Sequence, residues 1–594
     1  MTGATTSDSQ TTLRGGEWLL TPAMAGAVTT PETLTDEQRL IGRTASELVD
    51  REIVPRIESL EQKDWALARA LMRRAGELGL LGVDVAEAYG GAGLDKVGSL
   101  IVSERLARSA SFGATFGAHT NLTVVPIFLF GTEAQKQKYL PRLLDAGLIG
   151  AYGLSETGSG SDALGARTTA ARQADGGFVL NGEKMWITNG GFADLFVVFA
   201  KVDGEHFTAF LVERAAGVKS GHEERKMGLH GSSTTALIFQ DVKIPADSVL
   251  GEVGKGHRVA FNVLNFARFK LGAACEGGSH QAIRESARYA AERRQFGQPI
   301  ASFGAIKHKI GEMAVRTYAM ESLLYRIAGQ VDRRIAALPH DGREGAAAVA
   351  AFEEYAVEAS IAKVACSEAL NFVLDENIQI HGGNGYVRDY PAERHFRDAR
   401  VNRIFEGTNE INRLLIPGML ARRAVKGELP LVAAAKALRD ELLGPPAPPD
   451  PSDIPLAAER RAVDAMKKTA LMVLGTAMQT FAATLADEQE VLMHTADILI
   501  DAFAAESALL RAAAAHGASS ALHEAAARVF VNDAAMRIDA SARQALAAMA
   551  GGDALRTLLA ALRRLSKAVP VNTVALRRRL ADETVARGGY PFVS

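Results

Sequence analysis

Apolar residues recur at helical spacing over most of the chain. Within residues 35–145, one such face collects Ile41, Ala45, Leu48, Val49 and Ile53, as expected of an amphipathic helix. Thr35 and Gln38 have the spacing of a capping box, in which each side chain binds the other residue's free backbone amide, so a helix is expected to start there. The same periodicity returns over about 254–422 and 456–588. The pattern therefore predicts a mainly helical protein.

Residues 149–250 follow a different period. Short β-prone runs lie at 178–180, 195–199, 207–212 and 236–239. Between or beside them stand dipeptides typical of tight turns, namely Asp175-Gly176, Asn181-Gly182, Asn189-Gly190 and Asp203-Gly204. This pattern predicts a compact antiparallel β domain between two helical regions.

These changes of pattern divide the chain into successive parts. They are an N-terminal extension (1–34), an N-terminal helical domain (35–148), a β domain (149–250), a helical bundle (251–422), a linker (423–455) and a C-terminal helical domain (456–594). The linker contains the sequence GPPAPPDP at 444–451, which is stiff and cannot continue a helix. The longest uncharged stretch, 469–486, falls short of the roughly 20 apolar residues that span a bilayer, so a buried helix is expected there.

Composition narrows the class of protein. Hydrophobic residues make up 47% and charged residues 23%, which permits a packed core. Lys plus Arg number 67 against 69 for Asp plus Glu, so the net charge of −2 leaves no electrostatic footprint for nucleic acid. The 2 cysteines, Cys275 and Cys366, exclude a disulfide scaffold and fit a reducing compartment. The first 20 residues lack the apolar run of a secretory signal, and a cytoplasmic location is expected.

The C-terminal helical domain carries a basic cluster. Its members are Arg556, Arg563, Arg564, Lys567, Arg577, Arg578 and Arg579. Such a cluster can bind an anionic membrane surface, which would make the protein peripheral to a membrane. It can equally be a solvated face that pairs with acidic neighbours.

The sequence contains a formal match to a dinucleotide-binding motif but no metal-binding motif. Residues 158–163 read GSGSDA and match a dinucleotide fingerprint, but strand pattern follows where that fold needs a helix. The loop can still present backbone amides to a phosphate or a flavin. The 13 histidines form no metal-binding spacing, and His381 with His395 lacks a third ligand, so no metal site is predicted.

The most informative stretch is RVNRIFEGTNEI at 400–411. It sets the carboxylate of Glu406 between an apolar residue and a Gly-Thr turn, just before a helix. Desolvation there would raise the pKa of Glu406 and make it a usable general base. The alternative interpretation is an exposed glutamate in a helix-capping loop.

Together, the motifs resemble those of the acyl-CoA dehydrogenases. They are YGLSETGSGSD at 152–162, GEKMWITNG at 182–190, ERRQFG at 292–297, QIHGGNG at 379–385 and FEGT at 405–408. The resemblance covers residues 35–422, and the added C-terminal segment resembles the very-long-chain branch. It implies a mainly α protein with a central antiparallel β domain, a four-helix bundle and an extra C-terminal helical domain.

The resemblance also implies a reaction. Glu406 would remove the α-proton of a fatty acyl thioester while a β-hydride leaves to FAD, giving a trans-2-enoyl-CoA, with electrons passing on to an electron-transfer flavoprotein. The backbone amide of Glu406 and a flavin hydroxyl would polarise the thioester carbonyl. Some members carry the base before an arginine that matches Arg268, but Ala267 occupies that position here. Arg268 and Gly407 are assigned to substrate binding, although Arg268 could also be an ordinary surface charge.

Further residues are assigned to FAD by the same resemblance. They are Tyr152, Leu154, Ser155, Ser161, Trp186, Thr188, Arg293, Gln295, Phe296, Gln379, Gly382, Gly383, Thr408 and Glu410. Trp186 would stack on the flavin, Ser161 would also touch the CoA moiety, and the 293–296 and 379–383 segments would reach the FAD of a neighbouring subunit. Thr157 and Ser155 depart from a usual proline and threonine without removing a needed group.

The sequence says less about the length of the acyl chain and about the oligomeric state. Gly113 and Gly117 stand four residues apart, hence on one helical face. In the family this helix forms the tunnel floor, so the glycines predict a long-chain substrate; alternatively they permit close helix packing. In the very-long-chain branch the C-terminal domain occupies the place of a second dimer, so the resemblance implies a homodimer rather than a tetramer. An acyl-CoA oxidase that uses oxygen, and a non-catalytic assembly or scaffold paralogue, are the competing functions.

Overall fold

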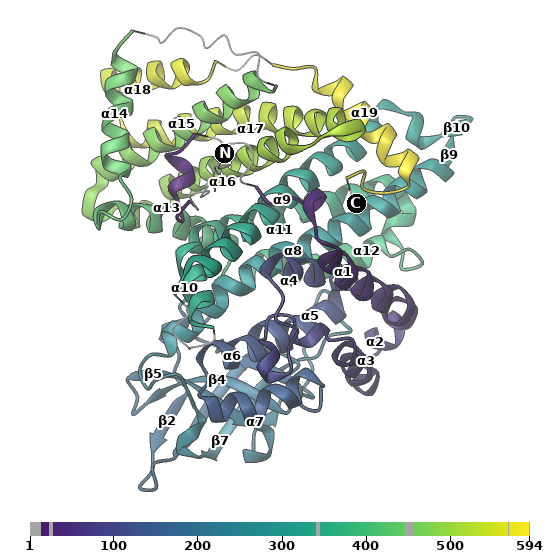
Figure 1. The fold of residues 1–594 in the computed structure, drawn as a ribbon, viewed down its shortest axis with the longest axis vertical. Helices are drawn as coiled ribbons and strands as arrows, with labels where there is room; N and C mark the ends of the chain where they lie inside the picture. Colours follow the sequence, from purple (N-terminus) through teal and green to yellow (C-terminus); the bar gives the residue numbers. More distant parts are fainter. Residues whose placement is uncertain (1–12, 23–27, 340–344, 446–454, 568–569, 593–594) are drawn as a thin grey trace, which may run out of the picture.

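The computed structural model describes residues 13–22, 28–339, 345–445, 455–567 and 570–592. Figure 1 shows the β domain at one end of the molecule, the long helices α8, α9 and α11 in the middle, and the C-terminal helices at the other end. The N-terminal helices lie beside the β domain and against the central bundle.

The N-terminal domain is helical, as predicted. Its α-helices are α1 (Asp36–Leu48), α2 (Ile57–Glu61), α3 (Trp65–Glu77), α4 (Lys96–Leu106), α5 (Ala110–His119), α6 (Val125–Phe130) and α7 (Glu133–Leu144). The predicted capping box is present, since Gln38 N donates to Thr35 Oγ1 at 3.2 Å and Thr35 N donates to Gln38 Oε1 at 2.9 Å. Helix α4 is buried on nearly all sides because it lies between α1 and the bundle helices α8 and α9.

The β domain is mixed rather than antiparallel, which corrects the prediction. Its strands are β1 (Gly150–Gly153), β2 (Thr169–Arg172), β3 (Phe178–Thr188), β4 (Leu195–Val202), β5 (His206–Glu213), β6 (Lys219–Ser220), β7 (Thr234–Ile244) and β8 (Val249–Leu250). The order is β6-β7-β3-β2-β4-β5-β8, with β1 also paired to β4. Both β1 and β2 run parallel to β4. Turn dipeptides identify only hairpins between consecutive strands, so they could not reveal these crossover pairings.

One of the predicted turns was also wrong. Asp175-Gly176 joins β2 to β3 and Asp203-Gly204 joins β4 to β5, as expected of hairpins. Asn181-Gly182 instead lies inside β3, where the pairing with β7 shifts register between Leu180 and Gly182. An Asn-Gly pair serves a β-bulge as readily as a turn, because both need a residue with positive φ.

The central bundle consists of long, deeply buried helices. They are α8 (Gly256–Glu292), α9 (Gly304–Ala337), α10 (Ala346–Glu354), α11 (Ala356–His381), α12 (Ala392–Ala399) and α13 (Asn409–Val425). Between α8 and α9 stands a small hairpin of β9 (Arg294–Gln295) and β10 (Gln298–Pro299), which the sequence did not predict because strands of two residues have no detectable period.

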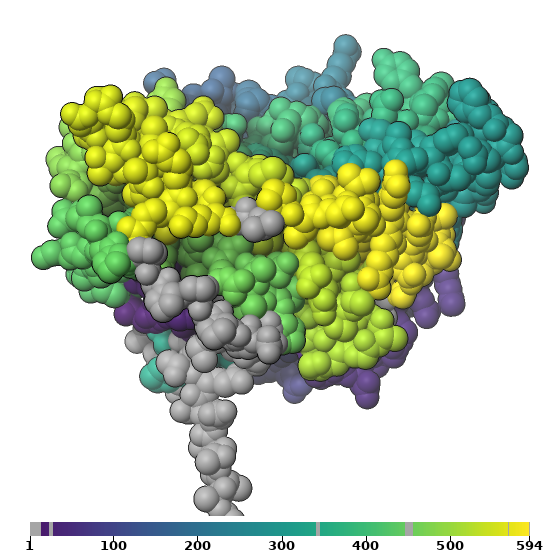
Figure 2. All heavy atoms as spheres, turned by 90° about the horizontal axis from the view of Figure 1, so that it is seen from above, coloured from purple at the N-terminus to yellow at the C-terminus, as the bar shows by residue number. Residues whose placement is uncertain are grey.

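A helix lies within the stretch predicted as a linker. Helix α14 (Leu431–Leu443) occupies part of the stretch interpreted as a linker, while residues 446–454 of the proline-rich connector lie outside the described residues. The C-terminal domain contains α15 (Ala457–Phe481), α16 (Gln489–Ala514), α17 (Ser520–Met549), α18 (Gly552–Leu565) and α19 (Thr573–Arg587). Figure 2 shows α18 and α19, in yellow, on the surface of this domain, and α19 also packs on α9.

The N-terminal extension packs against the same domain. Trp18 is 1% exposed, and its ring centroid lies 5.0 Å from that of Phe503 on α16. Residues at the two ends of the sequence therefore share one core.

Two features bear on membrane contact. Among the described helices, the stretch Ala457–Asp487 is long and apolar enough to cross a membrane, by length and composition only; its helix α15 packs against α16 and α17. Within the basic cluster, Arg577 is buried and pairs with Glu312 at 2.8 Å and with Asp533. Arg556 pairs with Asp553. Pairing with acidic neighbours thus accounts for part of the cluster.

Candidate active site

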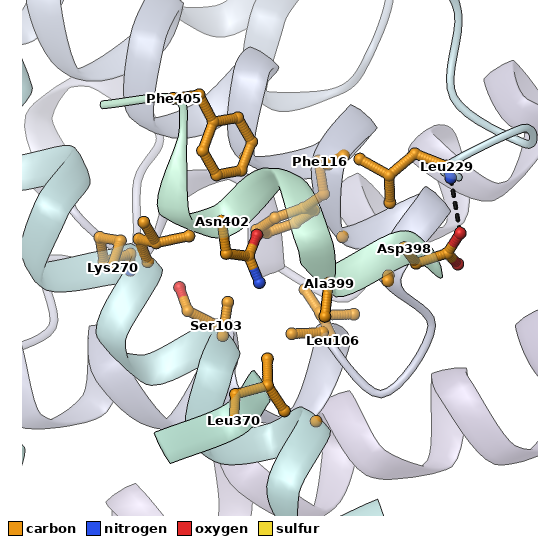
Figure 3. Close-up of a pocket in the computed structure, with 18 of the residues that line it drawn as sticks. Ser103, Leu106, Phe116, Leu229, Lys270, Leu370, Asp398, Ala399, Asn402 and Phe405 are labelled. Carbon is orange, nitrogen blue, oxygen red and sulfur yellow. Dashed lines mark hydrogen bonds between the residues drawn. The ribbon is translucent and has the colours of Figure 1, made fainter. Parts of the chain in front are cut away.

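A cavity of about 170 Å³ lies between the N-terminal helices, the central bundle and residues 398–406. Its apolar wall is formed by Leu106, Phe116, Leu271, Leu370 and Leu374. Figure 3 shows these helices surrounding the cavity, with Phe405 at one side. Gly113 and Gly117 of α5, the residues predicted to lie at a tunnel floor, both line the cavity.

The two glycines differ in what surrounds them. A Cβ on Gly117 would approach only Asn121 Nδ2, at 3.4 Å. A Cβ on Gly113 would lie 3.2 Å from the backbone Cα of Ala107. Gly117 therefore contributes open space to the cavity, whereas Gly113 also permits the close packing that was the alternative interpretation.

Glu406 lines the same cavity and is held by a specific turn. Its backbone has φ 58° and that of Gly407 has φ 79°, so two consecutive residues adopt the left-handed conformation. Arg268 Nε donates to the backbone carbonyl of Glu406 at 3.1 Å, and Asn412 Nδ2 donates to that of Gly407 at 2.8 Å. Thr408 Oγ1 accepts from Ile411 N at 3.3 Å and caps α13. The turn projects the Glu406 side chain from a rigid support.

The electrostatics of the site suit a base. Burial raises the pKa of Glu406 to about 7, against the opposing charges of Arg268 and Lys363. Burial lowers the pKa of the Arg268 guanidinium to about 10, and the nearby Glu406 carboxylate counteracts part of that change. Arg268 is 7% exposed, so it is not the ordinary surface charge that was the alternative. Ala267 also lines the cavity.

A hydrogen-bond network behind the turn was not predicted. Lys363 Nζ donates to Asn409 Oδ1 at 2.6 Å, and Asn409 Nδ2 donates to Glu368 Oε1 at 3.0 Å. Arg413 binds Glu368 at 2.7 Å and also Asp497 of α16 at 2.7 Å. The network connects the Glu406 turn to the C-terminal domain. These polar residues stand singly on separate helices and form no motif of fixed spacing. The sequence alone therefore could not show that they lie together.

Part of the predicted FAD set gathers beside the cavity. Tyr152, Leu154 and Ser155 lie on or just after β1, and Met185 N donates to Ser155 O at 2.9 Å, which brings Trp186 of β3 close to them. Thr188 of the same strand lines the cavity with Glu406. The Tyr152 hydroxyl is buried and has no hydrogen-bond partner within the described part of the chain.

These residues fit a planar cofactor. Trp186 is 59% exposed and has φ 59°, both uncommon for a tryptophan in a strand. A flat ring system stacked on it would cover this apolar surface. Thr408 and Glu410 lie at the start of α13, two and four residues beyond the base. Ser161 is exposed in the loop between β1 and β2.

The remaining predicted residues lie elsewhere. Arg293, Gln295 and Phe296 stand at the hairpin β9–β10, and Phe296 is 92% exposed. Gln379 lies in the last turn of α11, and beyond the end of that helix a Cβ on Gly382 or Gly383 would meet nothing within 4 Å. Neither segment lines the cavity. In Figure 1 the hairpin stands at the edge of the molecule, far from the β domain.

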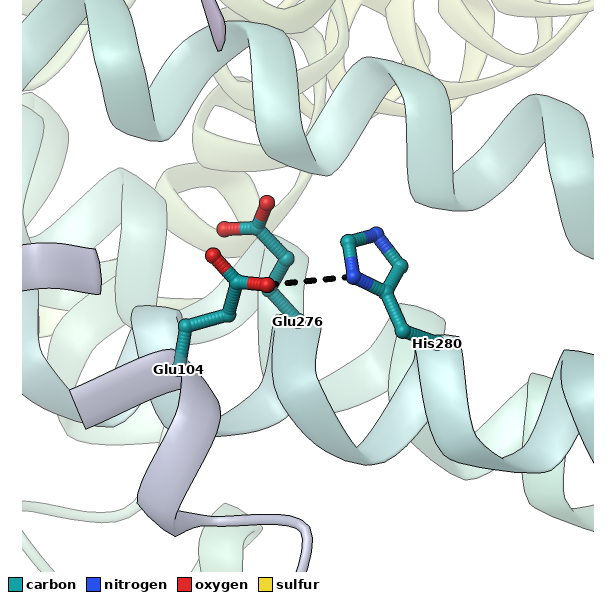
Figure 4. A group of neighbouring side chains, drawn as sticks. All are labelled: Glu104, Glu276 and His280. Carbon is teal, nitrogen blue, oxygen red and sulfur yellow. Dashed lines mark hydrogen bonds and ion pairs between the residues drawn. The ribbon is translucent and has the colours of Figure 1, made fainter. Parts of the chain in front are cut away.

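A separate buried cluster was also missed by the sequence. Glu104 of α4 and Glu276 and His280 of α8 hold ligand-type atoms within 4.8 Å of one another, the kind of group that can hold a metal ion (Figure 4). Glu104 Oε1 already contacts Arg105 at 2.7 Å and His280 Nδ1 at 3.2 Å. A cation bound to that oxygen would face the Arg105 guanidinium. The cluster is therefore better described as an ion-pair network than as a metal centre.

Comparison with known proteins agrees with the fold and the motifs. Acyl-CoA dehydrogenase family models match as the N-terminal domain at 35–146, the middle domain at 151–242, and C-terminal domains at 254–420 and 465–564. A "probable acyl-CoA dehydrogenase" of Bacillus subtilis (strain 168) is 45% identical over 578 residues, 96% of this chain and 97% of that protein.

Solved and longer relatives extend the likeness. The crystal structure of an acyl-CoA dehydrogenase complexed with FAD from Bacillus anthracis has a TM-score of 0.95 and 45% identity, covering 97% of this chain and 100% of that one. The human mitochondrial very long-chain specific acyl-CoA dehydrogenase is 38% identical over 372 residues, 61% of this chain and 53% of that protein.

The chain therefore belongs to the acyl-CoA dehydrogenases, which are oxidoreductases that act on CH–CH groups. The predicted family and the predicted fold class, a helical protein with a central β domain and an added C-terminal helical domain, are confirmed apart from the strand directions.

Proposed function

We propose that this protein catalyses the FAD-dependent α,β-dehydrogenation of long-chain fatty acyl-CoA to trans-2-enoyl-CoA in fatty acid β-oxidation, and passes the electrons to an electron-transfer flavoprotein. The observation that carries the proposal is the position of Glu406 at an apolar cavity, with its pKa raised to about 7. A base is most effective when its pKa lies near the working pH.

The chain's own residues supply the proton transfer and the carbonyl polarisation. Glu406 takes the α-proton of the thioester. Its backbone N–H donates no hydrogen bond within the described residues, so it is free to bind the thioester oxygen as negative charge develops there. Arg268 Nε donates to the carbonyl of the same residue at 3.1 Å and so restrains the turn that carries this N–H. The apolar wall excludes water from the reacting carbons.

FAD, when bound, supplies the acceptor for the β-hydride. Tyr152, Leu154, Ser155, Trp186 and Thr188 would hold it against the cavity, and Thr408 and Glu410 would close over it. The exposed Trp186 supports this assignment. The complex of the Bacillus anthracis relative with FAD supports FAD as the cofactor.

Long acyl chains and a homodimer belong to the same proposal. Gly117 leaves space in the cavity where a larger side chain would fill it. Phe296, at 92% exposure, and the open surface at Gly382 and Gly383 suit contact with the FAD of a second subunit. A cytoplasmic location fits the two cysteines, which are free and buried.

Anaerobic titration of the purified flavoprotein with acyl-CoAs of increasing length tests the proposal. The flavin absorbance is expected to bleach, most completely with long chains. Glu406→Gln should retain FAD but lose bleaching, with a rate at least about 10²-fold lower. No bleaching at any chain length would reject the dehydrogenase and leave the scaffold function. Peroxide released in air at the rate of turnover would instead favour an acyl-CoA oxidase.

A further inference from the structure

The cavity beside Glu406 is not uniformly apolar. Several polar side chains line it, but most have partners in the protein. Lys270 Nζ donates to Ser99 O at 2.6 Å, His395 Nε2 lies 3.1 Å from Glu285, and Arg108 binds Asp50 at 2.8 Å. Asp398 Oδ1 accepts from Leu229 N at 2.5 Å, as Figure 3 shows.

Ser103 and Asn402 are different. The Ser103 hydroxyl makes no hydrogen bond within the described part of the chain. The Asn402 amide makes a single contact, from Nδ2 to Cys275 Sγ at 3.7 Å, which is long and weak. In Figure 3 both side chains point into the cavity, among Leu106, Leu370 and Ala399. They stand on different elements, α4 and the turn at 400–403.

Polar groups without a partner in the protein favour the binding of some substrates over others. A saturated chain that displaces water from an amide and a hydroxyl leaves them unpaired, which weakens its binding. A hydroxyl on the chain is both donor and acceptor, as are the Asn402 amide and the Ser103 hydroxyl. Polar groups in an otherwise apolar pocket commonly set specificity in this way.

We propose that the preferred acyl group carries a hydroxyl, on a carbon beyond the reacting pair, that hydrogen-bonds to Asn402 and Ser103. This inference rests on the proposed function and names the substrate class for the same site. The substituent is neutral rather than a carboxylate. The cations that line the cavity are already paired, Arg108 with Asp50 and Lys270 with Asp84, and Asp398 adds a nearby acidic group.

The test compares matched pairs of substrates. CoA thioesters of one straight chain, unsubstituted or carrying one hydroxyl placed successively from the γ-carbon outward, are mixed anaerobically with the holoenzyme, and flavin reduction is followed by stopped flow. At least one hydroxyl position is expected to raise kcat/KM about tenfold over the unsubstituted chain. Asn402→Leu, similar in size and without the amide, should bring that ratio to one or below. Ser103→Ala should also lower this ratio of kcat/KM values.

Controls separate this inference from the function on which it rests. Leu106→Met alters the shape of the wall without altering its polarity, so it should preserve the ratio whatever it does to the rates. FAD content and thermal midpoint verify that each variant is folded; if Asn402→Leu fails to fold, Ser103→Ala decides. The inference is overturned if every hydroxyl position lowers kcat/KM, or if the ratio survives both substitutions. Absence of flavin reduction by every thioester would instead reject the proposed function.

Discussion

Glu406 sets the pH range in which the proposed reaction can run. Its pKa is raised to about 7, so at pH 6 most of the carboxyl is protonated and cannot accept a proton. The rate of flavin reduction at low acyl-CoA concentration should rise about tenfold per pH unit below pH 7 and level off above it. Stopped-flow measurements from pH 5 to 9 give the profile. A flat profile would mean that another group accepts the proton.

The same shift links Glu406 to stability. A carboxyl whose pKa is raised on folding contributes stability that is complete below its unfolded value of 4.5 and is lost as the pH rises through about 7. Glu406→Gln removes that loss, so the variant should be more stable than the parent at pH 8, on the order of 1–3 kcal/mol. The difference should vanish at pH 4. Chemical denaturation at both pH values measures it, and equal midpoints at pH 8 would contradict the assignment.

The neighbouring cations provide a second test at the residue scale. The charges of Arg268 and Lys363 both lower the pKa of Glu406, with Arg268 the larger influence. Arg268→Gln should therefore move the midpoint of the pH profile upward, and Lys363→Met should do so by less. Arg258→Gln removes an exposed charge from the same helix α8 and should leave the midpoint in place. A downward movement in Arg268→Gln would show that Arg268 does not act through charge.

Sequence could predict these roles only where a residue stands in a local pattern. The role of Glu406 could be predicted because an apolar residue and a Gly-Thr turn flank it. That of Arg268 could be predicted because the family motif places it. Lys363 and Asn402 have no such neighbours. They reach the site only through the packing of α11 and the 400–403 turn against α8, which no single segment encodes.

At the scale of elements, α5 lines the cavity through Gly113 and Gly117. Gly117→Leu should place a side chain in the open space, because only Asn121 lies within reach of a new Cβ. The kcat/KM for long acyl-CoA should fall at least about tenfold while that for the shortest substrates is less affected. Gly113→Ala provides a comparison: its Cβ meets the Ala107 backbone at 3.2 Å, so it should lower stability more than it changes chain-length preference. Equal effects of both on all chain lengths would remove the tunnel assignment.

Long helices and strands were predicted better than short ones. For α1, the apolar face and the start at the capping box were predicted. Strand partners were not, because β1 pairs with β4, a strand far along the chain: Gly150 stands opposite Leu195, 45 residues later. Parallel pairing across such a gap depends on the whole sheet. Helix α14 was not predicted, because the prolines that follow it led to the interpretation of the whole stretch as a linker.

At the scale of the molecule, buried ion pairs join the C-terminal domain to the dehydrogenase core. Arg511 of α16 is fully buried, contacts Glu321 of α9 at 2.5 Å and binds Glu32 of the N-terminal extension at 2.6 Å. The Tyr590 hydroxyl donates to the same Glu321 at 2.7 Å. Arg326 of α9 binds Glu506 of α16 at 2.8 Å. Segments far apart in sequence are thus held by buried ion pairs, and Glu321 Oε1 also lies 3.7 Å from Nε2 of His280, a member of the cluster in Figure 4.

Removing one member of this network should destabilise the whole protein. Arg511→Met keeps much of the side-chain volume but leaves Glu321 and Glu32 without their cation, which is expected to cost about 3–5 kcal/mol. Arg556→Met breaks the Arg556–Asp553 pair, whose side chains are 75% and 92% exposed, and should change stability by less than about 1 kcal/mol. Thermal denaturation compares the variants, and hydrogen exchange should show faster opening of α9 and α16 together in Arg511→Met. If only α16 opens, the C-terminal domain folds independently, and the buried network serves to orient it rather than to stabilise the core.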